Sequence, residues 1–239
     1  MKTHQWPIAT AIISAAISPT LTLAGDMRTQ TPQSIQVEPI MRERASSSAD
    51  AGLSFKSTTF PASDAAAVVA FWREAGPSLW FAKNQDFDQR FRERFLSLHE
   101  AAARGELAGW LGTADGALAL MVLLDQFPRN AFRGTPRMYA TDTLARELAN
   151  AAIDAGHDRA VPSELQLFFY LPFGHSEDLT DQERSVALAR RLGQPSLSHA
   201  ERHRDIIRRF GRFPHRNPIL GRPMRPEEQR FLDDGGFAG

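Results

Sequence analysis

Cysteine is absent from the 239 residues of this chain, and lysine is scarce. The absence of cysteine excludes disulfide bonds, thiolate nucleophiles and cysteine-ligated zinc or iron–sulfur sites. Basic and acidic residues number 28 each, so no net charge draws the chain toward nucleic acid. Arginine carries almost all of the positive charge, and any attraction for an anion must therefore be local.

Long segments that alternate apolar and polar residues are also absent, and this argues against half-buried strands. Apolar residues recur instead at intervals of three and four, as between Phe87 and Ala102, where Gly105 predicts the end of a helix. The segment that follows Thr113 is apolar on nearly all sides, which predicts a buried central helix. Further helices are expected over residues 143–156, 163–171, 199–210 and from Pro226. The sequence thus predicts an all-α fold.

Capping residues predict where some helices begin, and prolines predict where others end. Two pairs have the spacing of capping boxes: Thr180 with Glu183, and Ser198 with Glu201. The phrases "LDQFPRN" at 124–130 and "GRFPHRN" at 211–217 each predict a helix stop at a Phe-Pro pair, because proline disfavours helix at the residue before it.

The first 60 residues differ in character from the rest. Residues 1–24 have the layout of a secretory signal peptide, with one early lysine, an apolar run and small residues before Gly25, although a start codon further downstream is the alternative. The run is too short and too interrupted to predict a membrane span. Residues 25–60 lack periodicity and predict a flexible linker, followed by one domain over 61–239. Periplasmic or cytoplasmic location depends on whether the leader is genuine.

Residues 202–217, "RHRDIIRRFGRFPHRN", contain six arginines, two histidines and a single aspartate. His203 shares one helical stripe with Ile206, Ile207 and Phe210, so it is expected to face inward, where it is either a core histidine or a functional one. One aspartate cannot neutralise six arginines. The surplus charge requires either a carboxylate from another helix or an anionic ligand.

The segment "GHSED" at 174–178 offers histidine and carboxylate side chains in a turn, which are either plain surface groups or part of a site. We expect it to join the arginine-rich stretch in an anion-accepting cleft. His203 and His175 are the candidates for proton transfer, and Glu177 and Asp125 are the carboxylates that would orient them. The expected anion clamp consists of Arg129, Asn130, Arg133, Arg209, Arg212, His215, Arg216 and Asn217.

Two other uses of these residues are less well supported by the pattern. His199 and His203 have a spacing at which two imidazoles can share zinc, with Glu177 or His175 as a third ligand, but the glutamate of an HExxH motif is missing, so no metal site is assigned. The arginines of 202–216 have the spacing to follow phosphates of a nucleic acid, but apolar residues and histidines interrupt them. No nucleic-acid partner is therefore expected, and any cofactor stays unknown.

Three segments resemble recurring blocks of one bacterial family of helical proteins, domain of unknown function number 924. They are "LLDQFPRNAFRGTPRMYATD", "YLPFGHSED" and "ERHRDIIRRFGRFPHRNPILGR", and "VVAFWREAGPSLWFAKNQDFD" is similar to the opening block of that family. The resemblance covers about residues 67–232. It implies a TPR-like array of antiparallel helices, a chain that is usually cytoplasmic without an export segment, and no established activity.

A TPR-like fold offers an alternative to the small-molecule site. Helical arrays of this kind often hold a peptide on a concave surface, sometimes by its carboxylate. A scaffold of that type would need Arg129, Arg209 or Arg216 but would tolerate the loss of His203 and His175. The sequence leaves open whether the ligand is a small anion or a peptide, whether catalysis occurs, and the oligomeric state.

Overall fold

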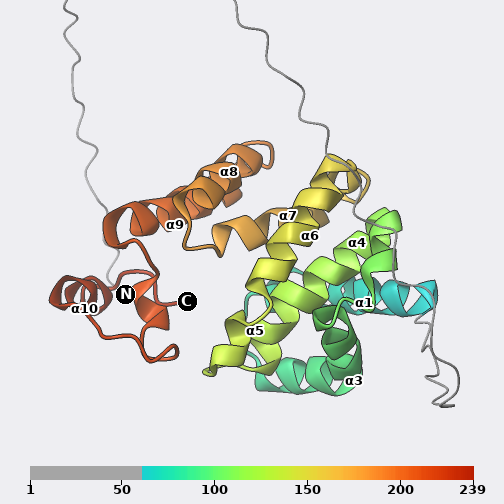
Figure 1. The fold of residues 1–239 in the computed structure, drawn as a ribbon, viewed down its shortest axis with the longest axis horizontal. Helices are drawn as coiled ribbons and strands as arrows, with labels where there is room; N and C mark the ends of the chain where they lie inside the picture. Colours follow the sequence, from blue (N-terminus) through green and yellow to red (C-terminus); the bar gives the residue numbers. More distant parts are fainter. Residues whose placement is uncertain (1–60) are drawn as a thin grey trace, which may run out of the picture. The chain divides into compact units, whose positions relative to one another are not determined.

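The structure is a computed structural model, and it describes residues 61–239 (Figure 1). The expected signal peptide at 1–24 and linker at 25–60 lie outside the described residues. All regular secondary structure in the described part is helical, which confirms the all-α prediction. The TPR-like arrangement stays a prediction. None of the described helices is both long enough and apolar enough to cross a bilayer.

The described elements are α-helices joined by short turns, several of which are 3₁₀-helical. The α-helices are α1 (Ala62–Ala75), α2 (Pro77–Trp80), α3 (Gln85–Ala103), α4 (Ala114–Met121), α5 (Phe127–Ala131), α6 (Asp142–Asp154), α7 (Ser163–Gly174), α8 (Leu179–Ala189), α9 (Ser196–Phe210) and α10 (Pro226–Asp233). The short turns are η1 (Ala108–Gly112), η3 (Pro136–Tyr139), η4 (His157–Arg159) and η5 (Pro214–Arg216), and η2 (Val122–Gln126) is a π-helical turn.

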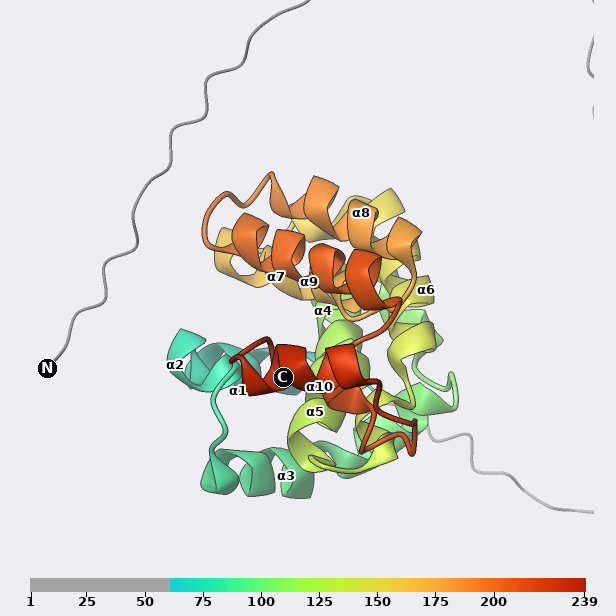
Figure 2. The same cartoon turned by 90° about the vertical axis from the view of Figure 1, so that its left-hand side faces the viewer.

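Helix α4 is the centre of the main core, as its apolar sequence predicts. Its residues from Gly116 to Met121 are all buried, and α1, α6 and α7 pack around it (Figures 1 and 2). Thr113 caps it by accepting a hydrogen bond from the backbone N–H of Gly116 at 3.1 Å. An aromatic cluster extends the core toward α3, where the rings of Trp72 and Phe91 lie 5.5 Å apart.

The prediction that the Phe-Pro pair at 127–128 stops a helix is wrong. The chain stays helical from α4 through η2 and α5, past Pro128. Proline removes a backbone donor, so carbonyls one turn earlier lose their partner. Side chains replace it: the Thr141 hydroxyl donates to the carbonyl of Leu124 at 2.5 Å, and Nδ1 of His99 lies 2.9 Å from the carbonyl of Leu123. The five-residue π turn and these substitute donors carry the helix through the proline.

Helices α7, α8 and α9 pack in sequence order, α7 on α8 and α8 on α9. Helix α7 continues through Pro172 to Gly174, past residue 171, where the sequence predicted its end. Both capping-box predictions in this region are wrong. Asp178 caps α8, because its carboxylate accepts from the backbone N–H groups of Thr180 and Asp181, and α9 begins before Ser198, at Ser196.

The segment after α9 turns back toward the middle of the domain. Gly211 ends α9 in the left-handed conformation, with φ of 70°, which glycine adopts without steric cost. The chain is then extended at Phe213 and forms η5 before α10. Figure 1 shows η5 and α10 beside α9, on the side of the domain away from α1 and α3. The turn η5 thereby presents its residues toward α5 and α6.

Candidate functional site

Asp125 and His175 come together in the interior, 50 positions apart in the sequence. Asp125 projects from the π turn η2 and is 0% exposed, and His175 follows the last residue of α7. Nδ1 of His175 lies 2.8 Å from Oδ1 of Asp125. Burial raises the pKa of Asp125, but Arg129 and His175 outweigh it, and the net pKa is lowered. An ionised carboxylate only accepts hydrogen bonds, so Nδ1 carries the proton.

Among residues 61–239, no hydrogen bond to the remaining ring nitrogen of His175, Nε2, is found. Burial lowers the pKa of His175, and Arg129 lowers it further, while Asp125 only partly compensates. Asp125 thus raises the pKa of His175, but burial dominates and the net pKa is lowered. His175 is neutral near pH 7, with Nε2 as a basic acceptor.

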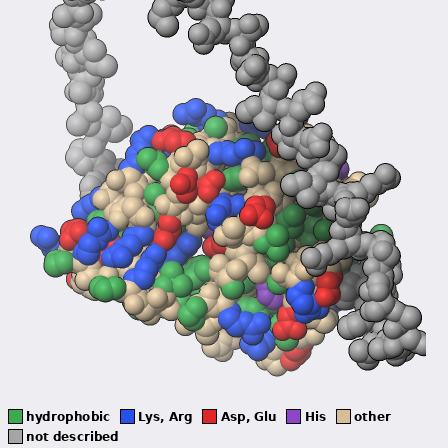
Figure 3. All heavy atoms as spheres, viewed as in Figure 1, with side chains coloured by type: hydrophobic (Ala, Val, Ile, Leu, Met, Phe, Trp, Pro, Cys, Tyr) green, Lys and Arg blue, Asp and Glu red, His purple; other side chains and the backbone are tan. Residues whose placement is uncertain are grey.

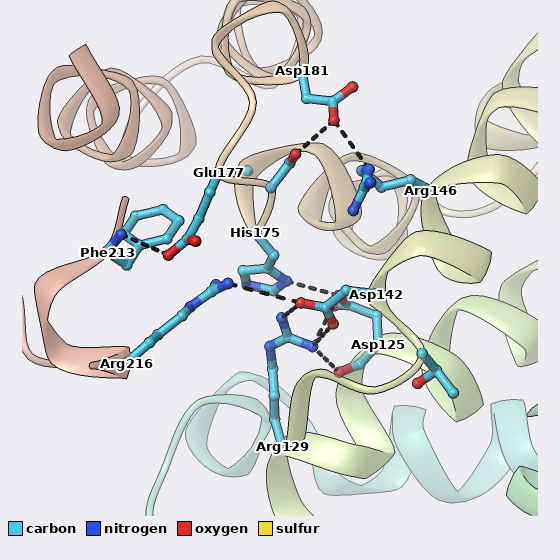
Figure 4. A network of polar contacts seen from close by, with 12 residues as sticks. Asp125, Arg129, Asp142, Arg146, His175, Glu177, Asp181, Phe213 and Arg216 are labelled. Atoms are coloured by element: carbon cyan, nitrogen blue, oxygen red, sulfur yellow. Dashed lines mark hydrogen bonds and ion pairs between the residues drawn. The ribbon is translucent and has the colours of Figure 1, made fainter. Parts of the chain in front are cut away.

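Arg129 anchors this pair to α6. Its guanidinium donates two hydrogen bonds to the carboxylate of Asp142, at 2.9 and 3.0 Å, and a third to the backbone carbonyl of Asp125 at 2.7 Å. The same guanidinium lies 3.2 Å from Oδ1 of Asp125 (Figure 4). Arg129 thus donates three hydrogen bonds within the protein, which leaves it with fewer donors than Arg216 for its expected role in an anion clamp.

Arg216, in η5, reaches the same group of residues from the opposite side (Figure 4). Its side chain is 8% exposed, and its nearest carboxylate oxygen is Oδ2 of Asp142, 3.9 Å away. No hydrogen bond from this guanidinium to any residue of 61–239 is found, and its Nε is a buried donor without a partner. Burial lowers the pKa of Arg216. A guanidinium has five N–H donors, and this one satisfies none of them with a well-formed hydrogen bond.

Glu177 is joined to the segment after α9. Its carboxylate accepts two hydrogen bonds from Arg222, at 2.6 and 3.0 Å, and one from the backbone N–H of Phe213 at 2.8 Å. Burial raises the pKa of Glu177, but these donors outweigh it and the net pKa is lowered. Glu177 therefore holds the turn η5 in place, and it makes no hydrogen bond to either of the histidines that we expected it to orient.

His203 and His215 lie close to this cluster but are held mainly by aromatic contacts. Nδ1 of His203 is 3.2 Å from the carbonyl of Gly174, and its ring packs 4.6 Å from that of Phe237. The ring of His215 lies 5.1 Å from the same phenyl group. Burial lowers the pKa of His203 to about 3 and that of His215 to about 4, with Arg216 contributing to both. Both imidazoles are neutral near pH 7.

Other members of the expected clamp make separate contacts. Asn130 and Arg133 both donate to Asp88 of α3, at 2.7 and 2.5 Å. Arg212 is paired with Glu228 of α10, through bonds of 2.7 and 2.8 Å. These arginines and the asparagine are paired with carboxylates of other helices. For Arg212 this corresponds to the first of the two possibilities that the sequence left open for residues 202–217.

Arg209 also lies away from His175. Its guanidinium sits over the rings of Phe210 and Phe231 and lines a surface hollow of about 480 Å³ between α9 and α10. Figure 3 shows basic side chains interspersed with acidic ones on the side of the molecule where these two helices lie. Asn217, in contrast, is fully buried, and it bridges Arg222 and Glu228.

Several residues of the site carry no signal of their own in the sequence. Asp142 was not singled out as a site residue, and it binds Arg129 and approaches Arg216. Arg222 and Glu228 were not singled out, although each is central to a group of hydrogen bonds. Their positions depend on the return of the chain after α9, and a pattern confined to one helix does not reveal such tertiary contacts.

No group of three His, Asp or Glu side chains within residues 61–239 is arranged to hold a metal ion. The cluster can instead present a hydrogen-bond acceptor, Nε2 of His175, beside an unsatisfied buried cation, Arg216. These two chemical features lie on different elements, after α7 and in η5, and Figure 4 shows both side chains pointing into the same group.

Comparisons with known proteins place the chain in a family. The model of a family of bacterial proteins of unknown function, DUF924, matches residues 68–236. A solved structure of a protein of unknown function from Agrobacterium tumefaciens is 57% identical, covers 73% of this chain and 99% of its own, and superposes with a TM-score of 0.72. No curated protein matches significantly. The chain belongs to the DUF924 family of bacterial proteins.

Proposed function

We propose that this protein binds a small anionic ligand on Arg216 and that His175 accepts a proton from the bound molecule. The observation that carries the proposal is the buried guanidinium of Arg216, which has no well-formed hydrogen bond among the described residues. A buried charge without hydrogen bonds costs several kcal/mol. An anion that enters this position supplies the missing acceptors.

The arrangement around His175 supports the second half of the proposal. A buried carboxylate that binds Nδ1–H of a histidine fixes the tautomer and leaves Nε2 as the acceptor, as in the Ser-His-Asp triad. Asp125 has this relation to His175, and Arg129 keeps the Asp125 carboxylate ionised. A positioned neutral imidazole of this kind is suited to general base chemistry near pH 7.

The π turn that carries Asp125 is consistent with a functional site. Such turns insert one residue into a helix and often occur where a side chain must be re-aimed. Here the turn contains Asp125, the carboxylate that binds His175. All of its residues from Val122 to Gln126 are buried. A helix interrupted in the interior needs substitute hydrogen bonds, which Thr141 and His99 provide.

Thermal unfolding of the full chain tests this function. Inorganic phosphate and acetate are added separately, and at a concentration one hundred times its Kd a bound anion raises the Tm by roughly 5–10 °C. Arg216→Gln is expected to abolish the shift. Arg209→Gln is the matched control, because Arg209 lies on the same strongly basic segment but away from His175, and it should leave the shift unchanged.

The proposal is wrong if neither anion shifts the Tm of the wild-type chain, or if both arginine variants respond as the wild type does. A Tm that rises only with short peptides, and that is unaffected by loss of His175, would favour the alternative of a helical scaffold that binds a peptide without catalysis. Circular dichroism of each variant at 20 °C checks that it folds, with roughly the wild-type helix signal expected.

A further inference from the structure

The charges that surround Arg216 balance without a ligand. Each guanidinium of the cluster faces one or more carboxylates. The cluster contains as many negative carboxylates as positive guanidinium groups. The carboxylates are Asp125, Asp142 and Glu177, and the guanidinium groups are Arg129, Arg216 and Arg222. Because these charges balance, a dianion placed here adds two uncompensated negative charges in a poorly solvated environment, whereas a monoanion adds one.

Asp142 strengthens the preference for a single charge. Its Oδ2 lies 3.9 Å from Nη1 of Arg216, so an anion bound to this guanidinium lies near a carboxylate that is already occupied by Arg129. Like charges at such short range repel strongly where water is scarce. The repulsion from Asp142 alone therefore roughly doubles when the ligand carries two charges instead of one.

The surroundings of Arg216 also favour a planar ligand group. Its guanidinium carbon lies 4.6 Å from the ring centre of Tyr139 and 4.5 Å from that of Phe213. Where an arginine stacks on an aromatic ring, it uses the face of the guanidinium and leaves its in-plane N–H groups for hydrogen bonding. A carboxylate meets those groups in the same plane, with two parallel hydrogen bonds.

His175 determines which chemical group the ligand needs next to its carboxylate. Its Nε2 is an acceptor without a donor among the described residues, and Figure 4 shows the imidazole beside the end of the Arg216 side chain. A ligand whose charged group sits on Arg216 therefore needs a hydrogen-bond donor close to that group. A hydroxyl on the adjacent carbon meets this requirement, and it is also the group from which a neutral imidazole accepts a proton.

We infer that the ligand is a small monocarboxylate that carries a hydroxyl group next to its carboxylate. This inference rests on the proposed anion-binding function of Arg216 and specifies its substrate class. The carboxylate pairs edge-on with Arg216, and the hydroxyl donates to Nε2 of His175. The phenyl groups of Phe213 and Phe237, which flank His203, are suited to contact the carbon atoms of the ligand.

Isothermal titration calorimetry of the full chain tests the inference with glycolate, acetate and inorganic phosphate. Glycolate and acetate differ by one hydroxyl, and a single hydrogen bond to a neutral acceptor is worth roughly fivefold in affinity. We expect glycolate to bind roughly fivefold more tightly than acetate, and both to bind more tightly than phosphate at pH 7.5, where phosphate is mostly a dianion.

His175→Asn separates the two roles of the imidazole. The asparagine side-chain amide reproduces the Nδ1–H donor to Asp125 but has nothing at the position of Nε2. This variant is expected to bind acetate like the wild type and to lose the preference for glycolate. Arg216→Gln is expected to bind neither carboxylate.

The outcomes separate the inference from the function on which it rests. Tighter binding of phosphate than of either carboxylate, abolished by Arg216→Gln, would overturn the substrate class and leave the anion site standing. Equal affinities for glycolate and acetate in the wild type, or a glycolate preference that survives in His175→Asn, would overturn the role of the hydroxyl. Absence of binding to all three anions would overturn both.

Discussion

Arg212 and Arg216 lie four residues apart in the same basic segment, but they differ in hydrogen bonding and in burial. Arg212 pairs with the carboxylate of Glu228 through two hydrogen bonds, within a cluster that also includes Arg225 and Asn217. Arg216 is more deeply buried and has no such bond. The difference shows that density of positive charge does not by itself mark a binding site. The arginine whose hydrogen bonds are incomplete is the better candidate.

The largest expected effect comes from breaking the saturated cluster at Glu228. This carboxylate is 0% exposed and accepts hydrogen bonds from Arg212, Arg225 and Asn217. These donors hold its pKa well below the usual range. Glu228→Gln removes the charge that the arginines neutralise and is expected to lower the free energy of unfolding by about 3 kcal/mol, measured by urea denaturation.

Glu227→Gln is the control for that experiment. Glu227 is adjacent in α10 but half-exposed, with one ion pair to Arg225 at 3.5 Å, and its loss should change stability by less than about 0.5 kcal/mol. Similar losses in the two variants would show that the buried carboxylate has no special role, and the contrast between the two arginine clusters would weaken.

Lowering the pH is expected to have an intermediate effect on the free energy of unfolding. The pH range over which stability is lost differs between the two clusters. The folded pKa of His203 is about 3, below its value of 6.5 in the unfolded chain, because burial disfavours the charged form. Below pH 6.5 the unfolded chain therefore binds a proton that the folded chain does not, and stability falls as the pH falls. The loss approaches 1.4 kcal/mol per pH unit for each such histidine, or about 2 kcal/mol between pH 6.5 and 5.

Urea denaturation at a series of pH values checks this, and His203→Gln should make the slope between pH 6.5 and 5 shallower, with the contribution of His215 remaining. The depressed pKa of Glu228 has the opposite range: its contribution is present above pH 4.5 and is lost as the pH falls below that value. Glu228→Gln should therefore leave the slope above pH 5 unchanged. A His203 resonance that titrates near pH 6.5 by NMR would contradict the burial argument.

The smallest effect is expected where the two arginines are compared directly. Arg216→Gln removes two aromatic contacts and a long ion pair, but it also relieves the cost of burying the charge. Because these effects oppose each other, the free energy of unfolding should change by less than about 1 kcal/mol in either direction. Arg212→Gln breaks two hydrogen bonds to a buried carboxylate and should destabilise the protein more. The reverse order, found by thermal unfolding without added anions, would argue that Arg216 holds the fold together.

The sequence predicted the parts of the site that depend on local pattern. The inward position of His203 followed from the spacing of Ile206, Ile207 and Phe210, and all three of these apolar residues are buried. The same spacing puts Arg209 off the apolar stripe, and the structure places it on the outer side of α9, over the ring of Phe231. Its assignment to the clamp relied on charge and disregarded this periodicity.

The two Phe-Pro phrases show what a local pattern does not reveal. They look alike, yet Arg129 after the first donates three hydrogen bonds, and Arg216 after the second donates none to the residues that the structure describes. The difference arises from Asp142, whose two oxygens both bind Arg129 and leave only a long contact for Arg216. Competition between two cations for one carboxylate is a property of the assembled fold, and no motif within either phrase encodes it.

The π turn at Val122–Gln126 makes the site sensitive to the number of residues as well as to their identity. One residue in an α-helix corresponds to a rotation of about 100°, so deleting a single residue from this turn would restore a regular helix and swing the side chains on one side of it around the axis. Asp125 would then point away from His175, with every residue of the cluster still present. A relative of this protein that retained both side chains but had one residue fewer in this turn would be expected to lack the paired imidazole and carboxylate.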